Sequence, residues 1–244
     1  MSTLAVEGLR VRLPTPAGDV TVVDGVDYEV QPAEVFGIAG ESGSGKTVSM
    51  LALLGLLPEG SSVEGSARFA GDDLIHMPRR RLRSISGRDI AMVFQDPFTS
   101  LHPMLSVGKQ VTEHVRLHLG LDRRAADERA VELLADVRIP DPPAALRRFP
   151  HQFSGGMRQR IAIAIALACR PRLLIADEPD DATAVDREAG TGDGAHAPAP
   201  AVVVDDDVGE LQRAHGANGS TGHASRRSPT RTSGGTSVRQ VSTA

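Results

Sequence analysis

The segment from Gly40 to Thr47 has the residue types and the spacing that bind phosphate groups. It reads Gly-Glu-Ser-Gly-Ser-Gly-Lys-Thr and matches the pattern G-x-x-x-x-G-K-[ST]. Glycines let the backbone curl so that successive N–H groups point at phosphate oxygens, and the dipole of a following helix adds positive potential. We therefore predict phosphate contacts along the whole loop, which comprises Gly40, Glu41, Ser42, Gly43, Ser44, Gly45, Lys46 and Thr47.

Two side chains of this loop have separate roles in the prediction. Lys46 would reach the β- and γ-phosphates of a nucleotide, and the hydroxyl of Thr47 would ligate Mg²⁺. The alternative is a surface turn rich in Gly and Ser. We favour the phosphate loop because the apolar run Val35–Ala39 precedes it and a stretch of helical character, Thr47–Leu57, follows it.

A second chemical pattern is an apolar run that ends in two carboxylates. Leu173 to Ala176 is apolar, and Asp177 and Glu178 follow it. Asp177 at a strand tip is placed to hold the Mg²⁺ shell, and Glu178 is placed to act as general base on an attacking water. Strands often end in a solvated acid, so this pattern alone is weak evidence for a catalytic site. It becomes strong evidence because the same chain contains the phosphate loop.

A third segment, from Pro150 to Arg160, places two glycines at the start of a predicted helix. Ser154 is a good N-cap residue, and Gly155 and Gly156 expose backbone N–H groups where a helix begins. One nucleotide does not need a second anion-binding helix end from the same subunit. The pattern therefore indicates a nucleotide held by another subunit, and the alternative is an ordinary capped helix.

Composition limits the classes of protein open to a chain of 244 residues. A formal net charge of −4 and an aromatic content of 3% argue against a nucleic-acid-binding surface. The single Cys169 excludes a disulfide framework and fits a reducing compartment. The longest apolar run, Ile161–Cys169, has nine residues, whereas a spanning helix needs roughly 20. The N-terminus has no signal-peptide pattern, so we expect any membrane association to go through a partner.

Strands and helices are expected to alternate in the first part of the chain. The apolar runs predict strands at 20–30, 35–39, 90–94 and 173–176. One buried helix face is predicted from the i, i+3, i+4, i+7 spacing of Ala130, Leu133, Leu134 and Val137. Strands that alternate with helices favour an α/β fold with a parallel sheet and crossover connections.

The composition changes at about Asp186. Leu211 is the only Leu, Ile, Met or aromatic residue beyond Ile175, and the end of the chain is rich in Ser, Thr, Gly and Arg. Such a segment buries too little apolar surface to offset the entropy of ordering. We predict a low-complexity, mostly disordered tail over 187–244, with one short strand at 201–204.

Taken together, these motifs resemble the ATP-binding subunits of ABC transporters, most closely those of the oligopeptide, dipeptide and nickel importer branch. The matching text is Gly40–Thr47 (Walker A), Phe94–Leu101 (the Q-loop), Phe153–Arg160 (the signature) and Ala168–Pro179 (including Walker B). The resemblance covers Leu4 to Pro179. It implies a P-loop NTPase core of ABC type in a domain over 1–186, with a helical insertion at about 96–152.

The resemblance also implies a function and a site. It implies ATP and Mg²⁺ as cofactors, ATP hydrolysis, and import of peptides or nickel through separate transmembrane permease subunits. The partners would be those permeases and a second ATPase subunit, with no nucleic acid, at the cytoplasmic face of the cell membrane. Gln95 would sense the γ-phosphate, join the Mg²⁺ ligands and link the ATP site to the membrane subunit. Ser154, Gly155 and Gly156 would bind the γ-phosphate of ATP held across a dimer interface.

The chain departs from this family in two places. No aromatic residue precedes Tyr28, which fits a core-facing strand position, so we expect adenine to rest on aliphatic side chains such as Leu13 or Val22. On alignment, Asp206 occupies the place of the family's switch histidine, and a carboxylate there would repel the γ-phosphate. A degenerate or truncated relative that binds ATP with little or no hydrolysis is therefore the alternative function. A soluble ABC protein acting on ribosomes or DNA is less favoured, because those relatives usually carry two cassettes.

Two further patterns are expected to lack a specific function. His114 and His118 are four residues apart on a predicted helix, and we favour a solvated face over a metal pair because zinc sites need further ligands. The run Arg79–Arg83 contains no aromatic residue, and we favour a solvated helix face over nucleic-acid binding.

Overall fold

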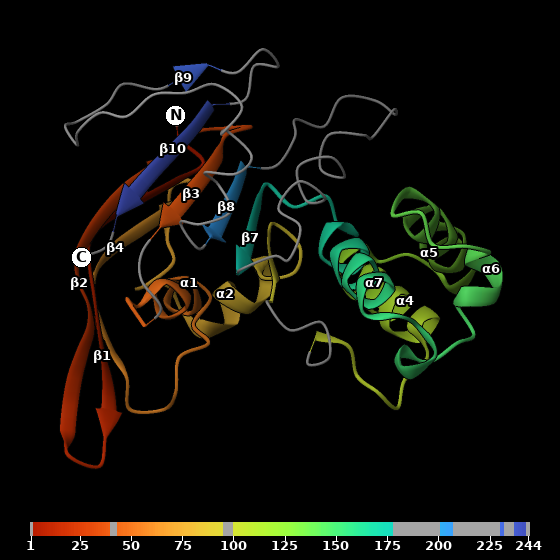
Figure 1. The fold of residues 1–244 in the computed structure, drawn as a ribbon, viewed down its shortest axis with the longest axis horizontal. Helices are drawn as coiled ribbons and strands as arrows, with labels where there is room; N and C mark the ends of the chain where they lie inside the picture. Colours follow the sequence, from red (N-terminus) through yellow and green to blue (C-terminus); the bar gives the residue numbers. More distant parts are fainter. Residues whose placement is uncertain are drawn as a thin grey trace, which may run out of the picture. The chain divides into compact units, whose positions relative to one another are not determined.

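The structure is a computed structural model that describes residues 2–39, 43–94 and 100–177, and the backbone of Ala201–Asp206, Thr230–Arg231 and Ser237–Ser242. The chain forms two compact units. The first comprises Met1–Leu82 with Ala201–Ala244, and the second comprises Arg83–Pro200. In Figure 1 the strands labelled β1 to β4, β8 and β10 belong to the first unit, and helices α4 to α7 belong to the second.

The first unit contains an antiparallel sheet built on a long hairpin. Strands β1 (Leu4–Thr15) and β2 (Gly18–Val30) pair along their length, and β4 (Ser62–Phe69) and β5 (Asp72–Asp73) extend the sheet in the order β2-β1-β4-β5. Leu4 lies opposite Val30 on one side and Phe69 on the other, and all three are buried. The predicted strand at 20–30 is thus confirmed as part of β2.

A parallel group of strands in the same unit surrounds β3 (Val35–Ala39). Strand β8 (Ala201–Asp206) pairs with β3 on one side and β10 (Ser237–Ser242) on the other, while β9 (Thr230–Arg231) is antiparallel to β10 (Figure 1). The predicted strands at 35–39 and 201–204 are confirmed, the second being two residues longer. The predicted boundary at Asp186 and most of 187–244 lie outside the described residues.

Strands β9 and β10 are two further short strands within the segment that is predicted to be mostly disordered. The backbone of β10 runs in register with β3, so that Val238 lies opposite Val35 and Val241 opposite Ile38. The backbone N–H and carbonyl groups of β3 pair with those of β10, although β3 is distant from β10 in sequence. Local composition, on which the expectation of disorder rests, does not contain that information.

Helix α1 (Lys46–Leu53) follows β3 and ends earlier than the predicted Thr47–Leu57. Gly55 has a φ of 64°, and a Cβ there would lie 2.8 Å from Cδ2 of Leu82. The Leu56 N–H donates to the Leu51 carbonyl at 2.9 Å and the Gly55 N–H donates to the Ala52 carbonyl at 3.2 Å. This is the left-handed glycine termination of a helix, which satisfies its last carbonyls and reverses the chain.

The arginine-rich run forms helix α2 (Arg79–Ile85). Leu82 is its buried residue, whereas the arginines at 79, 80, 81 and 83 are exposed. Arg81 pairs with Asp72 at 2.7 Å. The expected solvated helix face is therefore confirmed.

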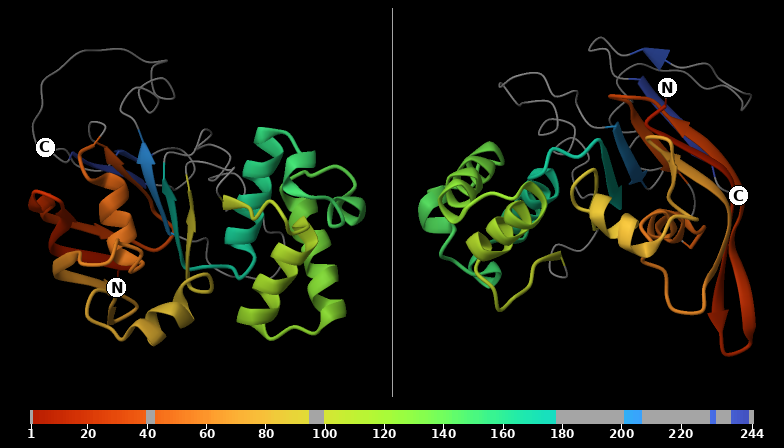
Figure 2. Two further views of the ribbon diagram at one scale, coloured as in Figure 1. Left: turned by 90° about the horizontal axis from the view of Figure 1, so that it is seen from below. Right: turned by 180° about the vertical axis from the view of Figure 1, so that it is seen from behind.

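The second unit contains a pair of parallel strands and a bundle of helices. Strands β6 (Ile90–Val93) and β7 (Leu173–Asp177) pair in parallel, which confirms the strands predicted at 90–94 and 173–176 to within one residue. The bundle comprises α4 (Val107–Leu119), α5 (Arg123–Asp136), α6 (Pro142–Ala145), the 3-10 turn η1 (Pro150–Gln152) and α7 (Gly155–Leu167). Figure 2 shows these helices from two further sides, in green to teal.

The bundle has its own apolar core. Leu101 and the buried faces of α4, α5 and α7 pack together with Phe153. The predicted face of α5 and its end is confirmed, because Ala130, Leu133, Leu134 and Val137 are all buried. Four of the helices begin at a side chain that caps the backbone, namely Ser106, Asp122, Asp141 and Ser154. No helix within the described ranges has the length and apolarity that crossing a membrane requires.

Replacing Leu134 with Ala should destabilise the helical bundle by about 2–5 kcal/mol, because its side chain is fully buried and the change leaves a cavity. Leu117→Ala is the matched control, since Leu117 is 78% exposed on α4 and should cost less than about 0.5 kcal/mol. Urea unfolding followed by circular dichroism at 222 nm measures both. Equal destabilisation by the two variants would contradict the described core.

Candidate functional site

The described part of the phosphate loop, Gly43–Thr47, follows β3 in sequence and leads into α1, whose first two residues it includes. Gly45 has a φ of 88°, and a Cβ added there would lie 2.6 Å from the carbonyl oxygen of Val22 and 3.1 Å from the Val23 side chain. Only glycine fits this approach to β2. The strand, turn and helix predicted around the loop are confirmed, whereas Gly40, Glu41 and Ser42 lie outside the described residues.

Lys46 and Thr47 are the first two residues of α1. Gly45 is the N-cap residue and offers no side-chain oxygen, and the first turn of α1 contains no acidic residue. A helix start of this kind presents backbone N–H groups and positive dipole potential to an anion. The Lys46 side chain is buried, at 6% exposure, while Thr47 is exposed. Both are therefore on the turn that the sequence assigned to phosphate and Mg²⁺.

Asp177 is the last residue of β7 and is buried, at 6% exposure. Its neighbour Ala176 lies opposite Val93 at the end of β6. Carboxyl ends of parallel strands share one edge of a sheet, so the chain leaves this edge towards Gln95 after β6 and towards Glu178 after β7. Gln95 and Glu178 themselves lie outside the described residues, and their catalytic roles stay predictions.

Ser154 caps helix α7, as predicted. Its side chain accepts a hydrogen bond from the Met157 N–H at 3.3 Å, and its φ and ψ are −65° and 164°. A Cβ added at Gly155 or Gly156 would meet no atom within 4 Å among the described residues. Packing among the described residues therefore does not require glycine at these two positions.

Phe153 anchors the chain immediately before this helix start. Its ring is buried in the bundle core, and the Arg148 guanidinium carbon lies 4.3 Å from the ring centroid. Arg148 also donates a hydrogen bond to the Gln152 carbonyl, and the Gln152 side chain accepts one from the Phe149 N–H at 2.8 Å. The turn before Ser154 is thus held by contacts of the Arg148, Gln152 and Phe153 side chains.

The phosphate loop belongs to the first unit, and Asp177, Ser154, Gly155 and Gly156 belong to the second. Within the first unit the structure brings the loop against Val22, one of the two aliphatic residues expected near adenine. Leu13, the other, is half-buried in β1. The adenine contacts of both residues stay predictions.

Tyr28 lies in the core, as expected for a residue that does not serve adenine. It is 8% exposed and stacks on Phe36 with ring centroids 5.2 Å apart. Burial raises the pKa of its phenol. Within the described part of the chain its hydroxyl has no hydrogen-bond partner.

The histidine pair differs from the expected solvated face. His114 and His118 are half-buried on α4, with ring centroids 4.8 Å apart, and the His114 Nε2 atom lies 3.1 Å from the Gly87 carbonyl oxygen. A Cβ at Gly87 would lie 3.0 Å from both rings. The pair therefore packs on the turn before β6. Among described residues no group of three metal-ligating side chains is present.

Sequence reasoning missed the residues that support the start of α4. Gly108 is the second residue of that helix, and a Cβ there would lie 2.6 Å from the Leu146 carbonyl oxygen. A glycine in the first turn of a predicted helix, where it costs stability, was the available signal. Gln110, on the next turn, gave no signal, because its partners are backbone groups.

Comparison with known proteins shows the family. The ABC transporter family model matches residues 23–181, so the chain belongs to the ABC transporter family. It is 46% identical over 186 residues to the oligopeptide transport ATP-binding protein OppD of Salmonella typhimurium, which covers 76% of this chain and 56% of that protein. It is 45% identical over 190 residues to the dipeptide transport ATP-binding protein DppD of Escherichia coli, covering 78% and 58%. The predicted resemblance to the peptide importer branch is thereby confirmed.

The chain spans little more than half the length of these relatives. Its fold is similar to that of the ATP-binding cassette MJ0796, solved as a dimer in a post-hydrolysis state bound to ADP and Pi. The TM-score is 0.69 at 23% identity, over 84% of this chain and 89% of that one. At this identity the likeness shows the fold, and it confirms the predicted α/β core of ABC type.

The free energy of unfolding should fall as the pH is lowered from 7.5 to 5. Burial lowers the pKa of His114, and the neighbouring His118 lowers it further; burial and Arg88 lower the pKa of His118. The unfolded chain, with ordinary histidine pKa values near 6.5, therefore binds more protons in this range than the folded chain. This contribution is complete above pH 6.5 and is lost as the pH falls through the lowered values.

Unfolding in urea at both pH values tests this expectation. The double variant His114→Gln/His118→Gln should show a smaller loss of stability between pH 7.5 and 5 than the unaltered chain. An identical loss in the two proteins would show that the pair does not carry the effect.

Proposed function

We propose that the chain is the ATP-binding and ATP-hydrolysing subunit that powers peptide import through separate transmembrane permease subunits. The observation that carries this proposal is the phosphate loop itself, a Gly45 turn packed against Val22 that leads directly into α1 with buried Lys46. The names of the relatives, which are oligopeptide and dipeptide transport ATP-binding proteins, support peptides as the cargo class. Import of nickel is the alternative cargo.

The donor set of the site fits Mg²⁺, which prefers oxygen ligands. The Thr47 hydroxyl at the start of α1, the Asp177 carboxylate at the end of β7 and the amide oxygen of Gln95 would hold the ion. When bound, Mg²⁺ neutralises charge on the β- and γ-phosphates.

The remaining steps belong to side chains and backbone groups of the chain. The loop N–H groups and the Lys46 ammonium hold the phosphates and stabilise charge that develops on the leaving oxygen. Glu178 accepts the proton of the attacking water. Ser154, Gly155 and Gly156 contact the γ-phosphate of ATP on a second ATPase subunit, which is supported by the open space at both glycines and the helix start behind them.

The proposed location is the cytoplasmic face of the cell membrane, where the subunit is held by its permease partners. Nucleic acid is not among the proposed partners, because the exposed arginines of α2 form an ordinary solvated helix face with no aromatic residue among them.

Lys46→Ala should lower the affinity for ATP at least about tenfold, because a charge-assisted contact to phosphate contributes about 1.5–3 kcal/mol. The chain has only one other lysine, Lys109, which is exposed on α4 and lies 3.7 Å from Glu113. Lys109→Ala is therefore the matched control and should bind ATP as the unaltered protein does. Titration calorimetry with Mg²⁺-ATP measures the affinities, and circular dichroism checks that each variant is folded. Unchanged affinity in folded Lys46→Ala would contradict the proposed site.

Asp206→His should raise steady-state ATP hydrolysis on the order of a hundredfold, which is the typical effect of one oriented hydrogen-bond donor at a developing charge. The backbone of Asp206 is in register with Ala39, the residue before the phosphate loop, which supports the proposed assignment of Asp206 to the switch position. Asp205→His is the control, since it adds the same side chain one residue earlier and should leave the rate unchanged. Equal rates in all three proteins would contradict the assignment of Asp206.

A further inference from the structure

The side chain of Gln110 on α4 is bonded to the loop that follows the Q-loop. Its Oε1 atom accepts a hydrogen bond from the His102 N–H at 2.9 Å. Its Nε2 atom donates to the carbonyl oxygens of His102 at 3.1 Å and Leu105 at 3.0 Å. One amide thus holds both ends of this loop, and each of its two N–H donors has an acceptor.

The first turn of the same helix is bonded to the segment that precedes the signature. The N–H groups of Val107 and Gly108 have no acceptor inside the helix, and they donate to the carbonyl oxygens of Arg148 and Leu146, each at 2.9 Å. Gly108 allows this approach, since a Cβ would lie 2.6 Å from the Leu146 oxygen. The two segments therefore share one helix turn as their support.

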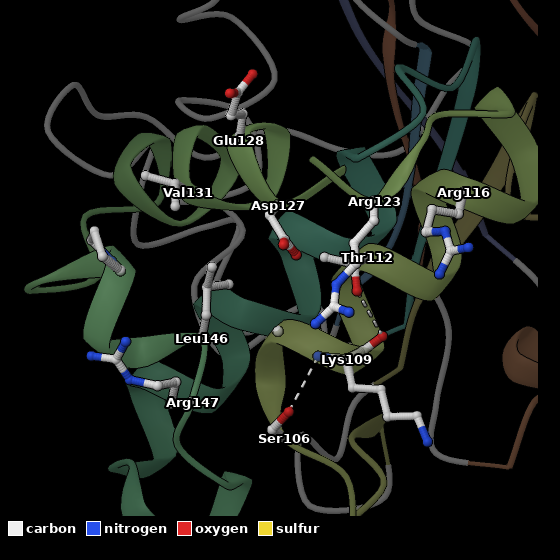
Figure 3. Close-up of a pocket in the computed structure, with 12 residues that line it drawn as sticks. Ser106, Lys109, Thr112, Arg116, Arg123, Asp127, Glu128, Val131, Leu146 and Arg147 are labelled. Carbon is white, nitrogen blue, oxygen red and sulfur yellow. Dashed lines mark hydrogen bonds between the residues drawn. The ribbon is translucent and has the colours of Figure 1, made fainter. Parts of the chain in front are cut away.

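Figure 3 shows this turn beside a groove of about 680 Å³ between α4, α5 and α6. The Ser106 side chain caps the turn by accepting from the Lys109 N–H at 3.3 Å, drawn as a dashed line. Leu146 and Arg147 also line the groove, and Figure 3 shows both below α5. The first turn of α4 is thus capped by Ser106 and bonded to the carbonyls of Leu146 and Arg148, while the Gln110 side chain holds the loop that precedes the turn.

The segment from Leu146 onwards leads to Ser154 through rigid contacts. Arg148 accepts from Val107 through its carbonyl oxygen, while its guanidinium lies over Phe153 and donates to the Gln152 carbonyl. Phe153 is buried in the bundle core immediately before Ser154. The first turn of α4 is therefore joined to the start of α7 by a continuous set of hydrogen bonds and packing contacts.

We propose that Gln110 is a positioning residue that ties the loop after the Q-loop to the segment before the signature, through the first turn of α4. The inference rests on the proposed function, in which Gln95 senses one nucleotide and Ser154 contacts another. Loss of the amide frees the loop at His102 and Leu105, which precedes the Ser106 cap. The Val107 and Gly108 donors then lose their fixed position, and so does the turn that presents Ser154.

Hydrogen–deuterium exchange of the full chain without nucleotide tests the structural part. In Gln110→Ala the amides of 102–105 and also those of 146–153 should exchange at least about tenfold faster, because three hydrogen bonds to the loop are lost. Gln110→Glu keeps the size of the side chain and loses both donors, so it should behave as Gln110→Ala does. Arg116→Ala, an exposed position on the same helix, is the control and should leave both segments unchanged.

Gly108→Ala tests the same connection by perturbing the contact between the first turn of α4 and Leu146. The added Cβ displaces the Leu146 carbonyl, so exchange should rise first in 146–153 and also in 102–105. Faster exchange that stays confined to 102–105 in the Gln110 variants would overturn the proposal. If Gln110→Ala speeds exchange throughout the chain, the exchange rates of Gln110→Glu and Gly108→Ala in 102–105 and 146–153 decide whether the proposal holds.

ATP hydrolysis supplies a readout that a merely structural role would not produce. Gln110→Glu should lower kcat at least about tenfold while the affinity for ATP is unchanged, because the phosphate loop belongs to the other unit. Equal losses of affinity and kcat would overturn the positioning role. If the unaltered protein neither binds nor hydrolyses ATP, the proposed function fails, and the exchange experiment still decides whether Gln110 supports both segments.

Discussion

The N–H groups in the first turn of a helix have no acceptor within that helix. In this chain the acceptors for these groups differ from one helix to the next. At α4 they are satisfied from inside the protein, by the Ser106 hydroxyl and by the carbonyls of Leu146 and Arg148. Helices α5 and α6 begin at aspartate caps. The starts of α4 and α6 are therefore closed, since Pro142 and Pro143 have no N–H, whereas the Asp122 side chain satisfies only the Ala125 N–H at the start of α5.

The starts of α1 and α7 have no aspartate cap. Gly45 caps α1 without a side-chain oxygen, and Ser154 caps α7 by accepting from Met157, which leaves the N–H groups of Gly155 and Gly156 without an acceptor among the described residues. Neither helix has an acidic residue in its first turn. An aspartate there would occupy the N–H groups and repel a phosphate, so its absence keeps both helix starts suited to an anion.

Features specified by neighbouring residues were predictable from the sequence. Strands β3, β6 and β7 follow from short apolar runs, and the Ser154 cap follows from a serine before two glycines. The end of α1 was also predictable from the sequence, because Gly55 is a local helix-termination signal. The prediction of a helix as far as Leu57 did not take it into account.

Features that depend on residues distant in sequence were not predictable. Strand β10 gains its hydrogen bonds from β3, and the His114–His118 pair gains its burial from Gly87. The amide of Gln110 bonds backbone groups whose position only the fold determines. Side-chain periodicity carries no information about such partners, so a glutamine on a helix reads as an ordinary polar residue.

Some glycines of this chain are required by packing inside the protein, and others are not. A Cβ at Gly45 would strike Val22, and one at Gly108 would strike Leu146, so the fold alone explains both. Gly155 and Gly156 are the first two residues of α7, no described atom lies within 4 Å of the position of a Cβ at either, and alanine has the higher helix propensity. Nothing in the described bundle offsets that cost. The proposed contact with a phosphate held by a second subunit would account for glycine at this helix start.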